Sequence, residues 1–279
     1  MILNKIYVDN IIKTALLEDI HYCDVTSDYL IPADQIDTAV FKAKAEGIVC
    51  GTEAAVRVFE IIDDEIEYEI LIHDGEEVKK GDRILTLKGR TVSLLKGERT
   101  ALNLIQHMSG IATASHRYAK IVEGTNASIA DTRKTLPGLR PLQKYAVMTG
   151  GAKNHRYNLS DAAMLKDNHI DAAGGITKAI EKLRSKIGHM TKIEVETRNL
   201  DELREALAAK ADIIMLDNMS IEAMKEAVEI TAGRAVLEAS GGITDETLRA
   251  VAETGVDIIS VGALTHSVTA FDISMVWAE

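Results

Sequence analysis

The segment 192–262 decides the fold, because it contains four short apolar runs at regular intervals: KIEVET (192–197), ADIIMLD (211–217), AVLEAS (235–240) and VDIISVG (256–262). A polar turn and a helix-like stretch follow each of the first three runs, and the run ends lie 20, 23 and 22 residues apart. This spacing predicts β-turn-α units with buried parallel strands. Asn199 and Ser220 are the expected N-caps of two of the intervening helices.

Two earlier runs extend the pattern to six strands, ASIADT (127–132) and AAMLK (162–166). Six parallel units with short turns place the chain in the α/β class. They favour a closed or nearly closed barrel over an open sheet. Spacing alone leaves a doubly wound sheet as the alternative.

The first 110 residues have a different pattern. AVFKAKAEGIVCG (39–51) and EYEILIHDGEEVKKGDRILTLKG (67–89) alternate like antiparallel strands, with helical stretches before and after them. The sequence therefore predicts a separate α+β sandwich domain over residues 1–110 and a barrel domain over residues 111–266. Residues 267–279 end apolar, and they can return to the first domain.

The overall charge of −11 argues against nucleic acid as a partner. Residues 132–169 reverse this balance, with seven basic residues against two acidic ones, so that this segment carries +5 and the remainder −16. One cationic stretch in an acidic chain indicates a small polyanionic ligand held in a cleft.

The other global features predict a cytoplasmic protein. No apolar stretch is long enough to span a bilayer, and the N-terminal residues lack the uninterrupted apolar core of a signal peptide. Cys23 and Cys50 are 27 residues apart without a CxxC motif, which favours a reduced pair over a disulfide or a metal site.

Polar and charged residues gather where the six strands end, which is where parallel α/β barrels collect their chemistry. These positions are Thr132, Arg133, Lys134, Lys166, Asp167, Asn168, His169, Glu196, Asp217, Asn218, Ser240, Gly241, Gly242 and Gly262. A guanidinium binds a carboxylate through two parallel hydrogen bonds, which suits Arg133 and Arg156, whereas lysine suits the dispersed charge of a phosphate.

Nine strings together make the chain similar to the quinolinate phosphoribosyltransferase family. They are GERTALNL (97–104), SGIAT (109–113), DTRKTLPGLR (131–140), GGAKNHR (150–156), SDAAMLKDNHI (160–170), IEVE (193–196), IMLDNMS (214–220), LEASGGI (237–243) and ISVGALTHS (259–267). The resemblance implies an N-terminal sandwich before an incomplete, TIM-like α/β barrel. The implied activity is that of a decarboxylating glycosyltransferase of NAD biosynthesis, acting on quinolinate and phosphoribosyl pyrophosphate. It also implies a homodimer with active sites at the interface, and a higher oligomer stays open.

The resemblance and the residue chemistry together assign roles. Arg133, Arg156 and His155 are expected at the quinolinate carboxylates, with Arg99 entering from a neighbouring subunit. Lys134 and Lys166 are expected to contact phosphoribosyl pyrophosphate and to act in catalysis. Thr132 is expected among the substrate-binding residues. Lys153 stands where many relatives have arginine, so it is left out of the predicted site.

Two further groups complete the predicted site. The carboxylates of Glu196 and Asp217 end adjacent strands, where they can hold the ribose hydroxyls and Mg²⁺ and stabilise positive charge at the sugar carbon. The 5-phosphate is expected at two late turns, formed by Ser240, Gly241, Gly242, Gly262, Ala263 and His266.

Three other functions stay open on the sequence alone. Lys166 could form a Schiff base in an aldolase-like lyase, although its polar neighbours do not favour a depressed lysine pKa. A same-fold phosphoribosyltransferase, such as the paralogues linked to molybdate transport genes, could use another base. A carrier role is disfavoured, since the only EAMK motif (222–225) lies far from the hairpin that resembles biotinyl and lipoyl domains.

Overall fold

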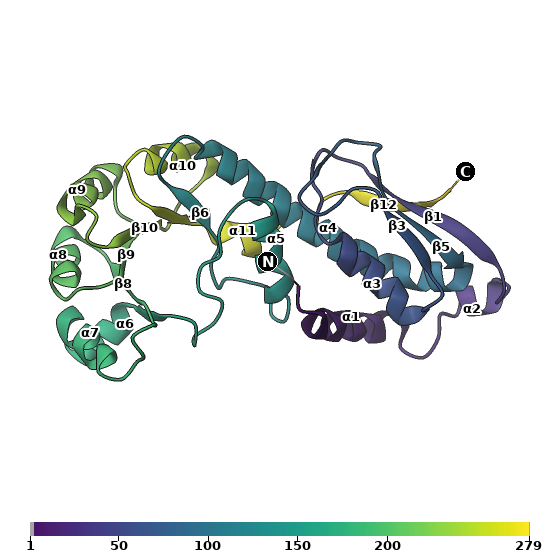
Figure 1. Ribbon diagram of the computed structural model, residues 1–279, viewed down its shortest axis with the longest axis horizontal. Helices are drawn as coiled ribbons and strands as arrows, with labels where there is room; N and C mark the ends of the chain where they lie inside the picture. Colours follow the sequence, from purple (N-terminus) through teal and green to yellow (C-terminus); the bar gives the residue numbers. More distant parts are fainter. Residues whose placement is uncertain (1–2, 279) are drawn as a thin grey trace. The chain divides into compact units, whose positions relative to one another are not determined.

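Figure 1 shows the computed structural model, which describes residues 3–278. Met1, Ile2 and Glu279, which the predicted domain boundaries include, lie outside the described residues. The chain forms two compact units. The first unit is built from residues up to His116, Thr135–Gly151 and residues from Ala263 onward, and the second from Arg117–Lys134 and Ala152–Gly262. The predicted boundary at residue 110 falls inside one helix, α4 (Thr91–Ile121).

The first unit contains a four-stranded antiparallel sheet in the order β12-β1-β5-β3 and a separate pair of short strands, β2 and β4. Besides most of α4, its elements are α1 (Lys5–Ile20), α2 (Ser27–Leu30), β1 (Ile36–Ala43), β2 (Gly47–Ile48), α3 (Thr52–Ile62), β3 (Glu67–Ile70), β4 (Glu77–Val78), β5 (Arg83–Arg90), α5 (Arg140–Thr149), α11 (Ala263–His266) and β12 (Ile273–Trp277).

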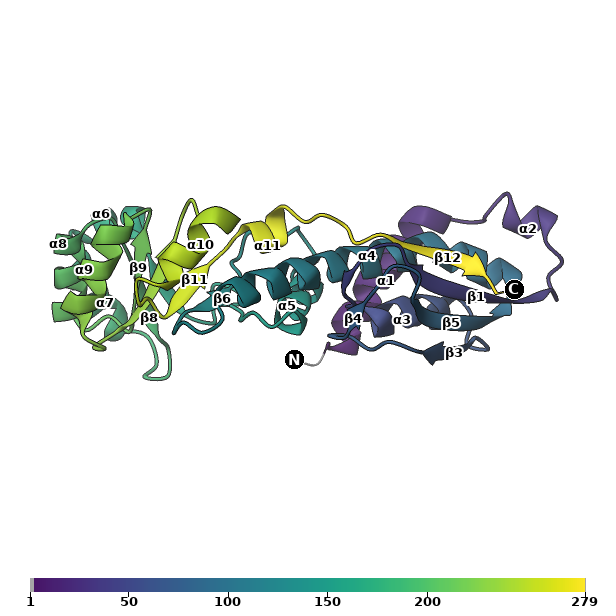
Figure 2. The same ribbon diagram turned by 90° about the horizontal axis from the view of Figure 1, so that it is seen from above.

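The core of the first unit lies between the sheet and helices α3 and α4. Phe41 of β1 and Phe59 of α3 are both fully buried and pack edge to face, with ring centroids 6.2 Å apart. Gly97 of α4 leaves room for Phe59, because a Cβ atom at residue 97 would come within 2.5 Å of that ring. Figure 2 shows β12 beside β1, where Val40 is the register partner of Val276. The last described strand therefore completes the first sheet.

An ion pair with a buried carboxylate joins the residue after α3 to the end of β5. Asp63 has a side chain that is only 1% exposed, and it accepts two hydrogen bonds of 2.7 Å from Arg90 and one of 2.7 Å from Ser93. The Arg90 guanidinium is the main reason that the pKa of Asp63 lies well below its usual range, against the opposing effect of burial.

We expect Asp63→Asn to lower the free energy of unfolding by about 1–3 kcal/mol at pH 7, because the charged acceptor of four hydrogen bonds, from Arg90, Ser93 and the backbone of Glu65, is lost. Since the folded-state pKa is depressed, this stabilisation is complete above the unfolded-state pKa of about 4 and is lost as pH falls below it. The difference between wild type and variant should therefore shrink in acid. Urea unfolding can be followed by the single tryptophan, Trp277, which lies in the sheet that contains Arg90. The exposed Asp64→Asn is the control, and equal effects of the two variants would contradict the prediction.

The second unit contains a six-stranded parallel sheet in the order β6-β11-β10-β9-β8-β7. Its elements are β6 (Ser128–Ala130), β7 (Ala163–Leu165), α6 (Asp167–Ala173), α7 (Ile176–Arg184), β8 (Ile193–Thr197), α8 (Leu200–Ala208), β9 (Ile213–Asp217), α9 (Ile221–Thr231), β10 (Val236–Ser240), α10 (Asp245–Ala252) and β11 (Ile258–Ser260).

This sheet curls, with α7, α8, α9 and α10 on its outer side (Figure 1). The two ends of the strand order, β6 and β7, do not pair with each other in the described part of the chain. The predicted incomplete barrel is therefore confirmed. The predicted caps are also observed: Asn199 accepts the backbone N–H groups of Asp201 and Glu202, and Ser220 accepts that of Ala223. Among residues 3–278, no helix is long and apolar enough to span a bilayer.

Candidate functional site

A pocket of about 290 Å³ opens where the strands of the second unit end, and we call it the strand-end pocket. Its lining consists of Thr132, Arg133, Lys134, His155, Arg156, Met164, Lys166, Glu196, Met215, Asp217, Glu238, Ser240 and Ser260. Nine of these residues are among those predicted from the sequence. They meet because the six strands are parallel, so that their carboxyl ends lie at one edge of the sheet.

Four cationic side chains from three segments line this pocket. Arg133 and Lys134 follow β6, Lys166 follows β7, and Arg156 lies in the loop between these strands. Arg156 donates from Nη1 to the carbonyl of Ala162 at 2.9 Å, which fixes the direction of its guanidinium. Burial lowers the pKa of Arg156, the nearby charge of Arg133 lowers it further, and Glu194 opposes both effects. Two guanidinium groups that repel each other favour a ligand with negative charge between them.

Of the three carboxylates that line this pocket, Glu196 and Asp217 lie on adjacent strands and the third is Glu238. Glu196 of β8 forms an ion pair with Lys166, and Asp217 is the last residue of β9. The Lys166 side chain is 46% exposed and that of Glu196 is 16% exposed, so the ammonium group stays accessible from the pocket mouth. Asp217 accepts a hydrogen bond of 3.1 Å from the side chain of Asn218.

The turn after β10 approaches Asn218 closely. Gly241 has φ +92°, and a Cβ atom there would lie 2.3 Å from the Asn218 side-chain oxygen. Only glycine avoids both the strained backbone and this clash. Gly242 follows with φ +61°. The turn therefore brings bare backbone next to the Asp217–Asn218 end of β9.

His155 is held by residues on or next to three strands of the second sheet. Its backbone N–H donates to Asp131 at 2.7 Å, and its Nδ1 accepts the backbone N–H of Arg156 at 2.8 Å. Its Nε2 lies 3.1 Å from Glu194 and 3.4 Å from Glu238, both of which are buried. A hydrogen bond from His155 to a substrate carboxylate would therefore use a ring nitrogen that already contacts protein.

The charge on this ring depends on opposing effects. Burial alone would lower the pKa of His155, but its interactions with Glu194 and Glu238 outweigh burial and raise the pKa to about 10. A doubly protonated ring would have to break the hydrogen bond that Nδ1 accepts from Arg156. Nε2 therefore carries a proton between the two carboxylates in either charge state, whereas Nδ1 accepts this bond only in the neutral ring.

Six residues to which the sequence analysis gave a role in substrate binding are not among those lining the strand-end pocket. Gly241 and Gly242 form the turn after β10, and Gly262 follows β11 in the second unit. Ala263 and His266 are the first and last residues of α11, and Arg99 is exposed on α4, all in the first unit.

The cationic segment 132–169 divides between the two units. Arg140 and Lys144 belong to α5 in the first unit, where Lys144 is fully buried and Arg140 donates to Thr135 at 2.9 Å. Lys153 bridges to Ala130 at the edge of the sheet. A charge count along the sequence therefore overestimates the number of cations that share the pocket.

Sequence reasoning missed four residues of the pocket: Met164, Met215, Glu238 and Ser260. Each stands two positions before a strand-end residue that was recognised. Side chains at i and i+2 of a strand point to the same side of the sheet. Reading inward from each strand end in steps of two would have found all four, as well as Glu194 two positions before Glu196.

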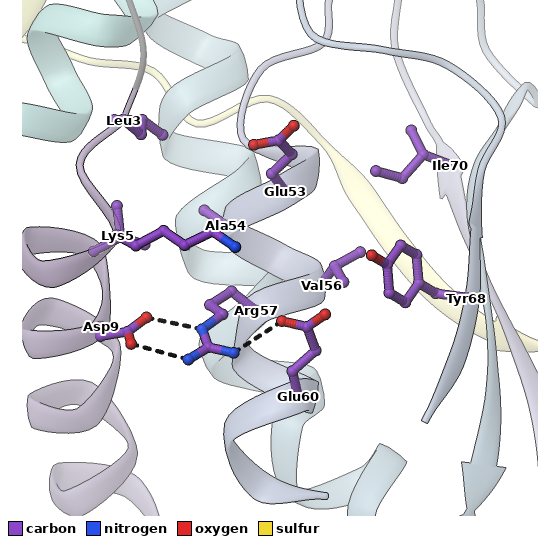
Figure 3. A pocket seen from close by; sticks show the side chains of 11 residues that line it. Leu3, Lys5, Asp9, Glu53, Ala54, Val56, Arg57, Glu60, Tyr68 and Ile70 are labelled. Atoms are coloured by element: carbon purple, nitrogen blue, oxygen red, sulfur yellow. Dashed lines mark hydrogen bonds and ion pairs between the residues drawn. The ribbon is translucent and has the colours of Figure 1, made fainter. Parts of the chain in front are cut away.

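The first unit has a pocket of its own, of about 370 Å³, shown in Figure 3. Arg57 on α3 donates to Asp9 at 2.8 and 2.9 Å and to Glu60 at 3.0 Å, so its charge is already satisfied. Acidic residues outnumber basic ones in this lining, since only Lys5 and Arg57 face Asp9, Glu53 and Glu60. The pocket does not suit a polyanion.

The chain is similar to known proteins over nearly all of its length. Residues 111–276 match the family model described as quinolinate phosphoribosyl transferase, C-terminal domain, and residues 24–109 match the N-terminal domain model. The chain is 44% identical over 273 residues to a probable nicotinate-nucleotide pyrophosphorylase (carboxylating) of Bacillus subtilis, covering 98% of this chain and 94% of the relative.

Two solved structures are similar over nearly the whole chain. The nicotinate-nucleotide pyrophosphorylase of Francisella tularensis superposes with a TM-score of 0.95 at 42% identity, covering 99% of this chain and 98% of the other. NadC of Streptococcus pyogenes superposes with a TM-score of 0.96 at 39% identity, over the full length of both chains.

Proposed function

Because the chain belongs to the quinolinate phosphoribosyl transferase family, we propose that its strand-end pocket joins quinolinate to phosphoribosyl pyrophosphate. The chain is a decarboxylating phosphoribosyltransferase that forms nicotinate mononucleotide, pyrophosphate and carbon dioxide in NAD biosynthesis. The observation that supports this use of the pocket is its lining, where four cations, Arg133, Lys134, Arg156 and Lys166, meet the strand-end carboxylates of Glu196 and Asp217.

The two neighbouring guanidinium groups suit quinolinate. Arg133 and Arg156 each offer a planar fork to one carboxylate, and their mutual repulsion falls when a dianion binds between them. Thr132 at the rim adds a hydroxyl group. Orientation by two such forks aligns the pyridine nitrogen with the sugar carbon that it attacks.

The other side of the pocket suits phosphoribosyl pyrophosphate. Lys134 and Lys166 present ammonium groups to the leaving pyrophosphate, while Glu196 and Asp217 hold the ribose hydroxyls and stabilise positive charge at the sugar carbon. The 5-phosphate is placed at the late turns, with Ser240 in the pocket lining. The other residues of this phosphate site are Gly241, Gly242, Gly262, Ala263 and His266.

Magnesium is the metal that we propose for this site. Glu196 and Asp217 supply carboxylate oxygens from adjacent strands, and Mg²⁺ is commonly bound by one or two carboxylates together with substrate phosphates and water. The donor set therefore fits. When bound, the ion would neutralise charge on the pyrophosphate, and Lys166 keeps Glu196 oriented toward the pocket.

The chemical sequence follows from these positions. The pyridine nitrogen donates its electron pair to the sugar carbon, and the bond to pyrophosphate breaks with its electron pair leaving on oxygen. The resulting pyridinium accepts the electrons released when the adjacent carboxylate leaves as carbon dioxide, and a proton from solvent replaces it. No covalent bond to the chain forms, so Lys166 acts as a charge rather than as a Schiff-base lysine.

We propose that the chain works as a homodimer, with a higher oligomer left open. Arg99 is exposed on α4, and Asn103 and His107 follow it at helical spacing on the same face. These two residues border a largely apolar hollow of about 620 Å³ within the first unit. An exposed arginine beside such a surface supports Arg99 of the partner subunit reaching the strand-end pocket.

Cys23 and Cys50 are free thiols, which supports a reducing compartment such as the cytoplasm.

Calorimetry with quinolinate and nicotinate tests the proposed function. Nicotinate lacks one carboxylate, so one guanidinium would stay without its anion, and we expect its binding to be weaker by about tenfold to a hundredfold. With phosphoribosyl pyrophosphate present, chelation of Mg²⁺ should abolish turnover of quinolinate. Tighter binding of nicotinate would indicate an enzyme that acts on a monocarboxylate. Turnover in the presence of chelator would contradict the proposed requirement for Mg²⁺.

A further inference from the structure

We propose that Glu194 and Glu238 are positioning residues, which hold His155 from two strands and thereby fix Arg156 for the dicarboxylate. This inference rests on the proposed role of Arg156 in the strand-end pocket. It assigns a function to a buried pair of acids that face His155, one of which, Glu238, also lines the pocket.

The two glutamates come from strands that are not neighbours. Glu194 lies on β8 and Glu238 on β10, with β9 and the buried Met215 between them. Both approach the same atom, His155 Nε2, at 3.1 and 3.4 Å. The imidazole therefore bridges the inside of the sheet across one strand.

This arrangement is not explained by stability. Glu194 and Glu238 are 2% and 3% exposed. Within residues 3–278, Glu194 Oε1 makes no hydrogen bond, and Glu238 Oε1 has the ion-pair contact of 3.4 Å with His155 Nε2 but no regular hydrogen bond. Burying an incompletely bonded carboxylate destabilises a fold, and apolar side chains would suit the middle of a buried strand better. Two such acids facing one histidine indicate a function.

The connection to substrate runs through the backbone. Asp131 accepts the His155 N–H at 2.7 Å, and His155 Nδ1 accepts the Arg156 N–H at 2.8 Å. With Nε2 held by the two glutamates, the ring cannot rotate without breaking contacts on both sides. The Arg156 main chain is thereby fixed, and its guanidinium is fixed again by Ala162. Glu194 also supplies negative charge near this guanidinium.

A metal site is the alternative for this cluster, because ligand atoms of His155, Glu194 and Glu238 all lie within 4.8 Å of one another. The hydrogen bond to Nδ1 argues against it. Since Nδ1 uses its lone pair for the Arg156 N–H, the ring proton sits on Nε2, and a protonated nitrogen has no lone pair for a metal.

The test uses Glu194→Gln and Glu238→Gln in the full chain, with the exposed Glu229→Gln on α9 as the matched control. We expect KM for quinolinate to rise about tenfold to a hundredfold in each variant, and KM for phosphoribosyl pyrophosphate to change by less than about threefold. The control should match wild type. Thermal melting identifies a variant that does not fold, and the other glutamine variant then carries the test.

A nuclear magnetic resonance measurement separates positioning from packing. The Nε2–H proton of His155 should be strongly deshielded and slow to exchange in wild type, and it should lose both properties in folded Glu194→Gln. Equal changes of both KM values, or an unchanged Nε2–H signal, would overturn the proposal. So would a stoichiometric transition metal that the variants lose. Wild type without quinolinate turnover would instead refute the proposed function and leave the proton measurement valid.

Discussion

Replacing Arg156 with alanine is expected to raise KM for quinolinate by at least about thirtyfold, because a buried carboxylate of the substrate loses its charged partner. Arg156 is fixed by Ala162 and lies close to Arg133, so no other group can take its place without moving. Steady-state kinetics with quinolinate as the varied substrate measures this effect, and Arg133→Ala should behave alike.

The matched control for Arg156→Ala is Arg204→Ala. Arg204 lies on α8, is half exposed and pairs with Asp201 and Glu226. The Arg204→Ala variant removes one positive charge from the second unit, as Arg156→Ala does, but leaves the pocket lining intact. Its kinetics should therefore equal those of wild type. Wild-type kinetics in Arg156→Ala would refute the assignment of Arg156 to the dicarboxylate.

The same variant tests the shared site of the proposed dimer. Mixing Arg156→Ala with Arg99→Ala subunits creates hybrid dimers, in which one pocket has its own Arg156 and receives Arg99 of the partner subunit. After random exchange, about a quarter of all sites should be active, although each variant alone is impaired. No recovery after demonstrated exchange would place Arg99 outside the site.

Replacing Lys166 with alanine is expected to lower kcat about a hundredfold or more, with a smaller change in KM for quinolinate. A positive charge aimed at the leaving group acts mainly as the bond to pyrophosphate breaks. Lys166 also pairs with Glu196, so its loss would leave this carboxylate without its cation beside the ribose. Single-turnover kinetics at saturating substrates separates this loss from weaker binding.

Two variants make the Lys166 result specific. Lys166→Arg keeps the charge and should keep more activity than the alanine variant. Lys178→Ala removes an exposed lysine from α7 and should have no effect. Unchanged kcat in Lys166→Ala would exclude the charge role. Borohydride trapping of a substrate on Lys166 would support the lyase alternative instead.

The parallel barrel could be predicted because its strands are local features. Each run is apolar, is followed by a polar turn, and returns after about one helix length, so the spacing reports the repeated unit directly. The site followed from the same pattern, since parallel strands bring their ends together. Thr132, Arg133, Lys134, Lys166, Glu196, Asp217 and Ser240 were found in this way.

The rest depended on contacts that sequence spacing does not report. Helix α5 lies within the predicted barrel domain, yet Gln143 donates to the carbonyl of Thr265 and contacts His107, which places it in the first unit. Lys144 of this helix was therefore counted with cations that it does not join. Glu194 and Glu238 were overlooked because they interrupt runs that otherwise look purely structural.

The pairing of β12 with β1 has a consequence for synthesis. Val40 cannot pair with Val276 until Val276 has been synthesised, and at ribosomal speeds the residues between them take about 10–50 s to be made. During that interval one edge of β1 is exposed and can pair with a neighbouring nascent chain. The strands of the second sheet, by contrast, can pair with one another while the first sheet still lacks β12. Newly made chains should therefore depend on chaperones mainly for the unfinished edge of the first sheet.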